Sequence, residues 1–255
     1  MLFGRYALDP LFYLDTSRYQ NCVVRVTYAM PISATVGFAT GTTTISVIAR
    51  LIDANANPYL GFVMTKEIAS ITTAASGDDA TILPLDWPYA GLMVQALLTQ
   101  IAPEAILTRA RLLQNAGQYI PFDMLSAEIL GENQSHFGYA YESFKPLVGT
   151  TFTWLSDLYS QTGAWFNIPG ATGKGIVTTV VAEQVIGAMT TGDSANVMQI
   201  AVQGLAPHGC FWMPLSDGVD PTGFYPVQGV QDLRLIKTQG TVSALMTVVS
   251  AQVRQ

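Results

Sequence analysis

The sequence predicts an all-β fold, an antiparallel β-sandwich with one or two short helices, and three observations support that prediction. Apolar and polar residues alternate over many short segments that are rich in Val, Ile and Thr. Gly, Pro, Asn and Asp separate about ten such segments at short spacing. Few segments show helical periodicity, so the pattern differs from that of alternating strands and helices.

The first half of the chain contains a series of predicted strands. In residues 42–53, Ile45, Val47 and Leu51 alternate with other side chains, which is typical of a strand with one buried face. A turn rich in Asn and Pro follows at residues 54–58. The predicted strands lie at 21–30, 42–53, 59–73, 79–86 and 91–99.

Residues 103–117 allow two interpretations. Ala, Leu, Arg and Gln favour a helix there, with Pro103 in its first turn and Gly117 after its end. The same residues also alternate in hydrophobicity and end in Asn-Ala-Gly, which suits a hairpin turn before residues 118–124. We favour the strand.

Two later segments are predicted to be helical. Residues 123–131 suit one or two turns, with Asp123 as the N-cap and Gly131 beyond the last turn. Residues 153–163 suit a second helix. Strands then resume, at 174–189, 196–205, 209–215, 232–238 and 243–253.

Low charge content sets this chain apart from most soluble domains. Apolar residues make up 49% of it and charged residues 12%, about half the usual charged share. Such a chain is expected to bury much of its surface against other subunits, and the alternative is a compact monomer with a neutral polar surface. Its basic residues are scattered singly, so direct binding of nucleic acid is not expected.

The two cysteines and the N-terminus indicate no special chemistry or targeting. Cys22 and Cys210 lie in apolar runs, without metal-ligand spacing or a disulfide framework, and are expected to be small buried side chains. No apolar stretch is long enough for a transmembrane helix, and the first ten residues lack the apolar core of a signal peptide.

Two segments near the ends of the chain share one pattern. Residues 8–27 and 219–238 both contain Asp-Pro, a short aromatic loop and then an apolar run that ends in Thr. Beyond a loop that is shorter in the second copy, the pattern of residues 45–47 recurs at 246–248. Each unit is therefore a predicted hairpin, and we favour duplication over chance similarity.

These phrases resemble a family of viral proteins. The closing hairpin pattern, together with residues 61–72, 82–98 and 120–124, is similar to major capsid proteins of the double jelly-roll lineage, which are found in tailless icosahedral viruses that often carry an internal membrane. The resemblance covers most of the chain. It implies a jelly-roll fold, homotrimeric pseudo-hexagonal capsomers, contacts with other capsid proteins, and a place in a virion assembled in the host cytoplasm.

The resemblance also implies a domain division. Residues 1–53 are expected to be the terminal hairpin of a first jelly roll whose opening strands are missing before Met1, and residues 54–255 a second jelly-roll domain. Two alternatives stay open. The hairpin packs onto a single large roll, or the chain divides near residue 130 into two small jelly rolls.

Several short motifs contain residue types that occur in phosphate-binding, calcium-binding or catalytic sites. Residues 169–175 lack the spacing and the Ser or Thr of a phosphate-binding loop. Asp78, Asp79 and Asp86 offer hard oxygen ligands to calcium, but a solvated loop is the favoured interpretation. His136 is flanked by aromatic residues and is expected to pack against them.

Other candidates are better explained by structure than by catalysis. His208 lies near Ser216 and Asp217, but no nucleophile elbow is present. Asp9 and Asp220 are interpreted as turn formers. Four aromatic residues that follow the two Asp-Pro steps are expected to cap the sandwich or to contact neighbouring subunits: Phe12, Tyr13, Phe224 and Tyr225.

The sequence therefore assigns no catalytic, cofactor-binding or metal-binding residue, and we expect neither an enzyme nor a cofactor. The leading prediction is a structural virion protein, a major capsid protein that forms trimeric capsomers of an icosahedral shell. The alternative is a jelly-roll binding module, such as a receptor- or glycan-binding spike or a cement protein. Its aromatic platform would come from residues 136–144 or 162–169.

Overall fold

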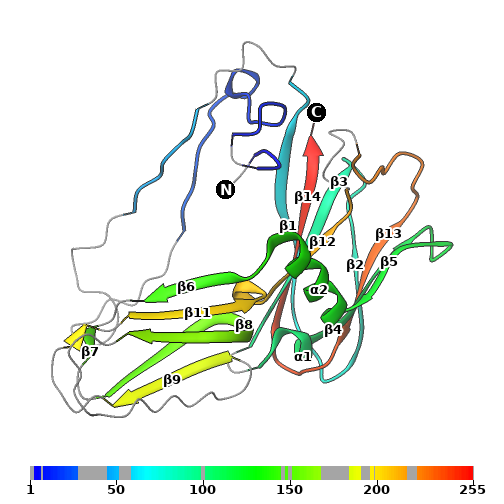
Figure 1. The fold of residues 1–255 in the computed structure, drawn as a ribbon. Coiled ribbons are helices and arrows are strands. Elements are labelled where there is room, and N and C mark those ends of the chain that lie inside the picture. The colour runs from blue at the N-terminus through cyan, green and yellow to red at the C-terminus, as the bar shows by residue number, and fades with distance from the viewer. Residues whose placement is uncertain are drawn as a thin grey trace. The chain divides into compact units, whose positions relative to one another are not determined.

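The computed structural model describes most of the chain (Figure 1). Contacts divide the chain into two compact units, residues 1–63 with 254–255 and residues 64–253. The described residues are 3–6, 8–27, 45–51, 59–98, 101–144, 147–148, 151–167, 184–190, 196–197, 199–216 and 223–254.

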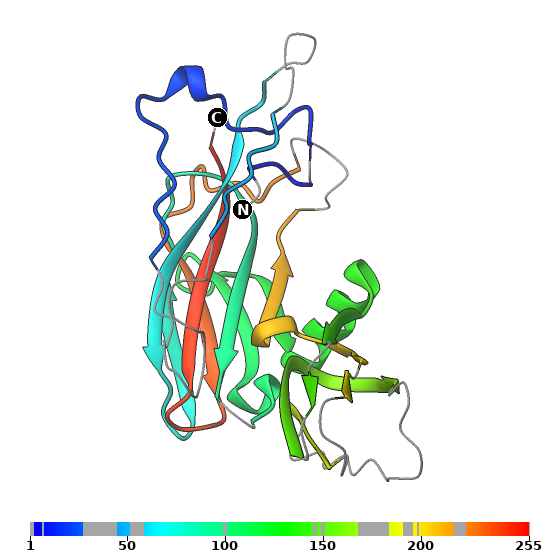
Figure 2. The same ribbon diagram turned by 90° about the vertical axis from the view of Figure 1, so that its left-hand side faces the viewer.

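Two four-stranded antiparallel sheets pack together as a sandwich. The first sheet has the order β1-β14-β3-β12, and three of its strands run side by side in Figure 2. The second has the order β2-β13-β4-β5. The prediction of a mostly β, sandwich-like fold is confirmed. The strands are β1 (Phe62–Thr72), β2 (Gly77–Ile82), β3 (Tyr89–Leu97), β4 (Leu107–Gln114), β5 (Tyr119–Leu125), β12 (Cys210–Pro214), β13 (Leu233–Gln239) and β14 (Leu245–Arg254).

The core forms because alternate side chains of both sheets point inward. In the first sheet, Val94 of β3 pairs with Phe211 and Val248 on either side, and all three are buried. In the second sheet, Leu235 of β13 pairs with Leu112 of β4, and both are buried. Burial of each such aliphatic side chain contributes about 1.5–3 kcal/mol, so these cross-strand rows hold the sheets together.

The structure resolves the ambiguity at residues 103–117. Only a single turn, α1 (Pro103–Ile106), is helical, and β4 follows it directly. Asn115, Ala116 and Gly117 take positive φ angles in the turn that leads to β5. The preference for a strand is therefore confirmed.

The helix predicted at residues 123–131 exists, but its predicted ends are wrong. Helix α2 (Ser126–Phe137) begins after Leu125, whose backbone N–H donates to the Glu128 carboxylate at 2.8 Å. Asp123 instead lies in β5, where it binds Arg109. Gly131 lies inside the helix, and Gly138, with φ 71°, follows its last residue.

The predicted helix at residues 153–163 is wrong, because this segment belongs to β8 (Thr151–Asn167). Its Thr, Trp and Tyr residues favour strands when neighbours are present, and β8 has a neighbour on each side in the sheet β6-β11-β8-β9. The strand predicted at 174–189 is confirmed over 184–189, and its residues 174–183 lie outside the described part of the chain. The strand predicted at 196–205 is confirmed within the described residues. The bounds are β6 (Ala140–Phe144), β7 (Leu147–Val148), β9 (Gln184–Thr190), β10 (Asn196–Val197) and β11 (Gln199–Leu205), with β7 pairing β10.

The predicted repeat is not found. Residues 21–27 and 45–51 form no strand, whereas their predicted counterparts lie in β13 and β14. Val24 is 69% exposed, while Leu235 is fully buried. Moreover, β13 and β14 lie in different sheets, so they do not form a hairpin. Residues 28–30, 52–53 and the turn predicted at 54–58 lie outside the described part of the chain.

The sandwich takes strands from both sides of residue 130, so a division there would cut through it. The assignment of residues 1–53 to a first jelly roll stays a prediction. In the unit that contains those residues, the chain is organised around Asp9 and a short 3-10 helix, η1 (Thr16–Arg18). A second 3-10 helix, η2 (Pro207–Gly209), precedes β12.

Candidate functional site

Two of the three acidic residues considered as calcium ligands, Asp78 and Asp79, bind cations of the protein, and the third, Asp86, is exposed. Asp79 Oδ2 lies 2.7 Å from the Lys237 Nζ atom, and Lys237 also donates to Thr81 Oγ1 at 2.6 Å. Asp78 accepts from Arg111 and from Thr238. No three His, Cys, Asp or Glu side chains gather in a metal-binding arrangement within the described ranges.

The outer face of the second sheet carries an ion-pair row. The guanidinium of Arg109 on β4 binds the Asp123 carboxylate on β5 through two hydrogen bonds, of 2.6 and 2.7 Å. The hydrogen bond from Arg109 holds the pKa of Asp123 below its usual value. Exposed Ile82 and Leu125 lie on the same face. The sequence did not identify this row, because it depends on which strands are neighbours.

The two histidines lie in different settings. His208 occupies η2 with φ 54°, and its carbonyl accepts from the Gln95 amide at 3.1 Å. Ser216 is described but Asp217 is not, so the proposed His-Ser-Asp grouping lies partly outside the described residues. His136 is exposed near the end of α2, with its ring centroid 6.3 Å from that of Phe137. Residues 169–175 also lie outside the described part.

The residues after Asp9 form a turn, as the sequence predicted. Asp9 is buried, and its carboxylate accepts from Arg5 Nε at 2.7 Å and from the backbone N–H of Leu11 at 3.0 Å. Burial alone would raise the pKa of Asp9, but the hydrogen bonds from Arg5 and Leu11 outweigh it and leave the pKa below its usual value. Phe12 is buried beneath the Arg5 guanidinium, 4.9 Å from its ring centroid. Asp220 lies outside the described residues.

Two further predicted aromatic residues, Tyr13 and Tyr225, serve internal packing. Tyr13 makes an edge contact with Tyr59 at 5.0 Å between ring centroids. Tyr225 pairs with Tyr89 through two backbone hydrogen bonds, packs against the sandwich core, and donates its hydroxyl hydrogen to the Gln114 amide. Tyr225 thus caps the sandwich, as one of the two sequence interpretations expected.

The cysteines differ from their prediction in one respect. Cys22 is an exposed thiol, contrary to the expectation of a buried side chain, because its segment forms no strand. Cys210 is half-buried in β12, and this burial raises the pKa of its thiol. Both are free cysteines.

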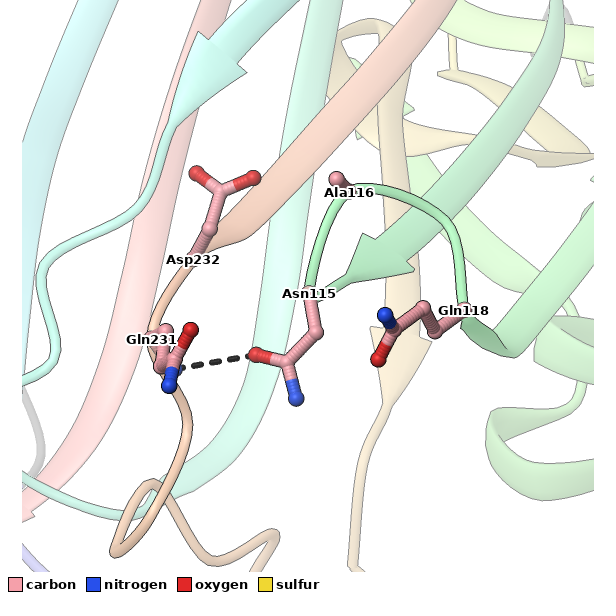
Figure 3. Close-up of a pocket in the computed structure, with 5 residues that line it drawn as sticks. All are labelled: Asn115, Ala116, Gln118, Gln231 and Asp232. Carbon is pink, nitrogen blue, oxygen red and sulfur yellow. Dashed lines mark hydrogen bonds between the residues drawn. The ribbon is translucent and has the colours of Figure 1, made fainter.

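A polar hollow of about 390 Å³ lies where the β4–β5 turn faces the segment before β13 (Figure 3). The backbone N–H of Asn115 donates to the Asp232 carbonyl at 2.8 Å, and the Asn115 side-chain oxygen accepts from the Gln231 N–H at 2.9 Å. These bonds fix the walls of the hollow. It is lined by Asn115, Ala116, Gln118, Gln231 and Asp232.

The hollow presents hydrogen-bonding groups to solvent. The side-chain amides of Gln118 and Gln231 bond to no other described residue. Asp232 contributes a carboxylate that Arg234 Nε contacts at 2.8–2.9 Å. Such a surface suits a small neutral ligand with several hydroxyl groups. No sequence pattern predicted this hollow, because its two groups of residues lie far apart in the chain.

Two extended segments leave their apolar side chains in solvent. We call residues 21–27 and 45–51 the apolar arms. Neither belongs to a strand, and in the second arm Ile48 is 87% and Leu51 90% exposed. Exposed apolar groupings of this kind mark interaction surfaces. The exposed large apolar residues of the arms are Val23, Val24, Val26, Ile45, Val47, Ile48 and Leu51.

Comparison of the chain with protein-family models, with curated proteins and with solved structures gives no match. None of the described helices combines the length and apolar character that crossing a membrane requires. The function is therefore inferred from strand order, surface character and side-chain chemistry.

Proposed function

We propose that this chain is a structural virion protein, a subunit of an icosahedral shell built on a jelly roll. The observation that carries the proposal is the strand order of the sandwich, β1-β14-β3-β12 against β2-β13-β4-β5. Successive strands of the sandwich alternate between the two sheets except at β4 and β5, which pair with each other in the second sheet. The last strand, β14, lies beside the first, β1, as two Greek keys would place them. Viral capsid domains, lectins and cupins share this architecture.

Surface character favours a shell subunit over the other two classes. Only 12% of the residues are charged, and the arms expose seven large apolar side chains. A chain of this kind is suited to burying surface against identical neighbours. A cupin would need clustered metal ligands, and the described residues hold no such cluster. The step from fold to function is an analogy between architectures.

The number of described strands favours a single jelly roll over the double form. A pseudo-hexagonal trimer needs two rolls in each chain, and the described residues contain one eight-stranded sandwich. The separate sheet β6-β11-β8-β9 lies between β5 and β12 in sequence. We therefore propose a subunit with one complete jelly roll that first assembles as a homotrimer. Its proposed partners are other capsid proteins and an internal membrane, and its proposed location is the virion.

Size and shape of the purified full-length protein test the proposal. Light scattering after gel filtration, from low to high micromolar concentration, is expected to give a trimer or a larger assembly. Negative-stain microscopy of the same fractions is expected to reveal regular capsomers or closed particles. A monomer over the whole concentration range, with no particles at high salt, would contradict the proposal.

The polar hollow supports a second candidate, a glycan-binding module. Its two amides that are unpaired among the described residues, those of Gln118 and Gln231, match sugar hydroxyls, each of which both donates and accepts a hydrogen bond. Saturation-transfer NMR with a panel of neutral saccharides tests this candidate. A glycan site would be supported if the saturation-transfer signal is lost in Gln118→Ala and kept in the control variant Asp86→Ala. No transfer from any saccharide would exclude it for that panel.

A further inference from the structure

We propose that the apolar arms are strands completed by a second copy of this chain, through pairing with the open edge of that copy's β1. This inference deepens the proposed function and rests on its premise that the chain assembles with itself. It concerns residues 21–27 and 45–51 as one partner and residues 62–72 as the other.

The arms have the sequence of strands without the structure. Val23, Val24 and Val26 in the first arm, and the alternating Ile45, Val47 and Leu51 in the second, are residues that strongly favour sheets. Yet both arms lack strand pairing and expose these side chains. Strand propensity is realised only when a neighbouring strand supplies hydrogen bonds and side-chain contacts. The missing element is therefore a partner strand.

Addition of a strand to a sheet edge is the binding mode that fits such a segment. An extended arm presents unpaired backbone N–H and C=O groups on both sides, and a sheet edge presents the same groups along one side. Each arm is seven described residues long, enough for a strand of ordinary length.

Of the four edge strands of the sandwich, β1 fits best. The edge of β12 is occupied by the side chain of Asn133, which lies on α2. With its amide oriented to bond both backbone groups of Trp212, Asn133 donates to the Trp212 carbonyl at 2.7 Å and accepts from the Trp212 N–H at 3.0 Å. The carboxylates of β2 are bound by Lys237 of the adjacent β13 and by Arg111 of β4, one strand further on. Strand β5 runs directly into α2. In contrast, β1 is eleven residues long, and among the described strands it pairs with β14 alone. The Val63 N–H at its start donates to the Phe3 carbonyl at 2.7 Å, so the open edge begins after that residue.

The exposed part of β1 carries one acidic residue, Glu67, that can pair with an arginine of an arm, beside one basic residue, Lys66. Thr65, Lys66 and Glu67 of β1 are exposed, and the arms carry Arg25 and Arg50. None of Glu67, Arg25 and Arg50 forms an ion pair with another described residue. The described residues of the arms pair with no strand, and we assign their partner edge to a second copy.

A charge-swap series in the full-length protein tests this contact. Arg25→Glu, Arg50→Glu and Glu67→Arg are compared with Asp86→Arg, a charge reversal at an exposed site outside both surfaces. Self-association, measured by light scattering over a dilution series, is expected to weaken about tenfold with Glu67→Arg and with at least one arm variant. The double variant that combines the two is expected to regain most of the loss.

Hydrogen exchange of the wild-type assembly supplies the second measurement. Amides of at least one arm and of residues 65–67 are expected to exchange slowly in the assembled fraction and rapidly in dilute monomer. If the wild type assembles while both arms exchange rapidly and no double variant recovers, the inference is overturned and the shell function stands. If the arms become protected in a dimer that never forms capsomers, the inference stands and the shell function fails.

Discussion

The first apolar arm and strand β13 carry similar sequences in opposite environments. Both are short runs rich in aliphatic residues, each after an Asp-Pro step and an aromatic loop. Leu235 of β13 is fully buried between β2 and β4, whereas Val24 of the arm is 69% exposed. Alternation of apolar residues therefore allows a segment to form a strand, but the strand forms only where neighbouring strands are present.

We expect the greatest loss of stability from a substitution at Leu235, and almost none from the matching substitution at Val24. Leu235→Ala removes a fully buried side chain and is expected to lower the free energy of unfolding by about 2–5 kcal/mol. Val24→Ala is expected to change it by less than about 0.5 kcal/mol in the dilute monomer, since the side chain is exposed. Urea titration followed by tryptophan fluorescence measures both. Equal losses would mean that the arm is as much part of the folded core as β13 is.

The sandwich buries the cation of Lys237 beside Asp79, whereas Arg25 and Arg50 of the arms are exposed. Asp79→Ala leaves the fully buried Lys237 ammonium without its carboxylate and is expected to cost about 3 kcal/mol. Lys237→Met is expected to cost less, since water reaches the remaining Asp79 carboxylate, which is 33% exposed. The same urea titration compares the two variants. The reverse order would show that packing around the lysine stem, and not its charge, dominates.

The edge of β12 is closed by Asn133, whereas we propose that the edge of β1 is filled by a second copy of the chain. Asn133→Ala removes the amide that satisfies both backbone groups of Trp212, and is expected to cost about 1–2 kcal/mol. Glu132→Ala, one residue earlier in α2, serves as the control. Thermal unfolding should separate the two variants, and coincident transitions would argue that the β12 edge does not need Asn133.

The smallest effect concerns the unit that contains the arms. The folded-state pKa of Asp9 lies below its unfolded value, so Asp9 stabilises its turn above that unfolded value, about 3.9. This stabilisation is lost as the pH falls through the lower folded pKa. NMR is expected to record a shift of the Leu11 amide in that range, since this N–H donates to the carboxylate. Asp9→Asn should remove the shift, and a shift that persists would assign it to another group.

The sequence predicted most of the sandwich strands but erred where neighbours decide the outcome. Residues 103–117 were assigned correctly, because their alternation outweighed weak helix preference. Residues 153–163 were assigned to a helix from the spacing of a few side chains, and the flanking strands of β8 override that signal. The helix at 126–137 was found, but not its ends, because Asp123 pairs with Arg109 on the adjacent strand.

The amino-acid sequence was enough to predict a chain built mainly of strands, a surface with few charges and a turn at Asp9. These follow from local alternation, composition and side-chain-to-backbone hydrogen bonding. Only the tertiary structure decided which strands are neighbours, that Lys237 is buried against Asp79, and that the apolar arms lie in solvent. The physical reason is that strand pairing and burial join residues far apart in the chain, and a local pattern does not specify its partner.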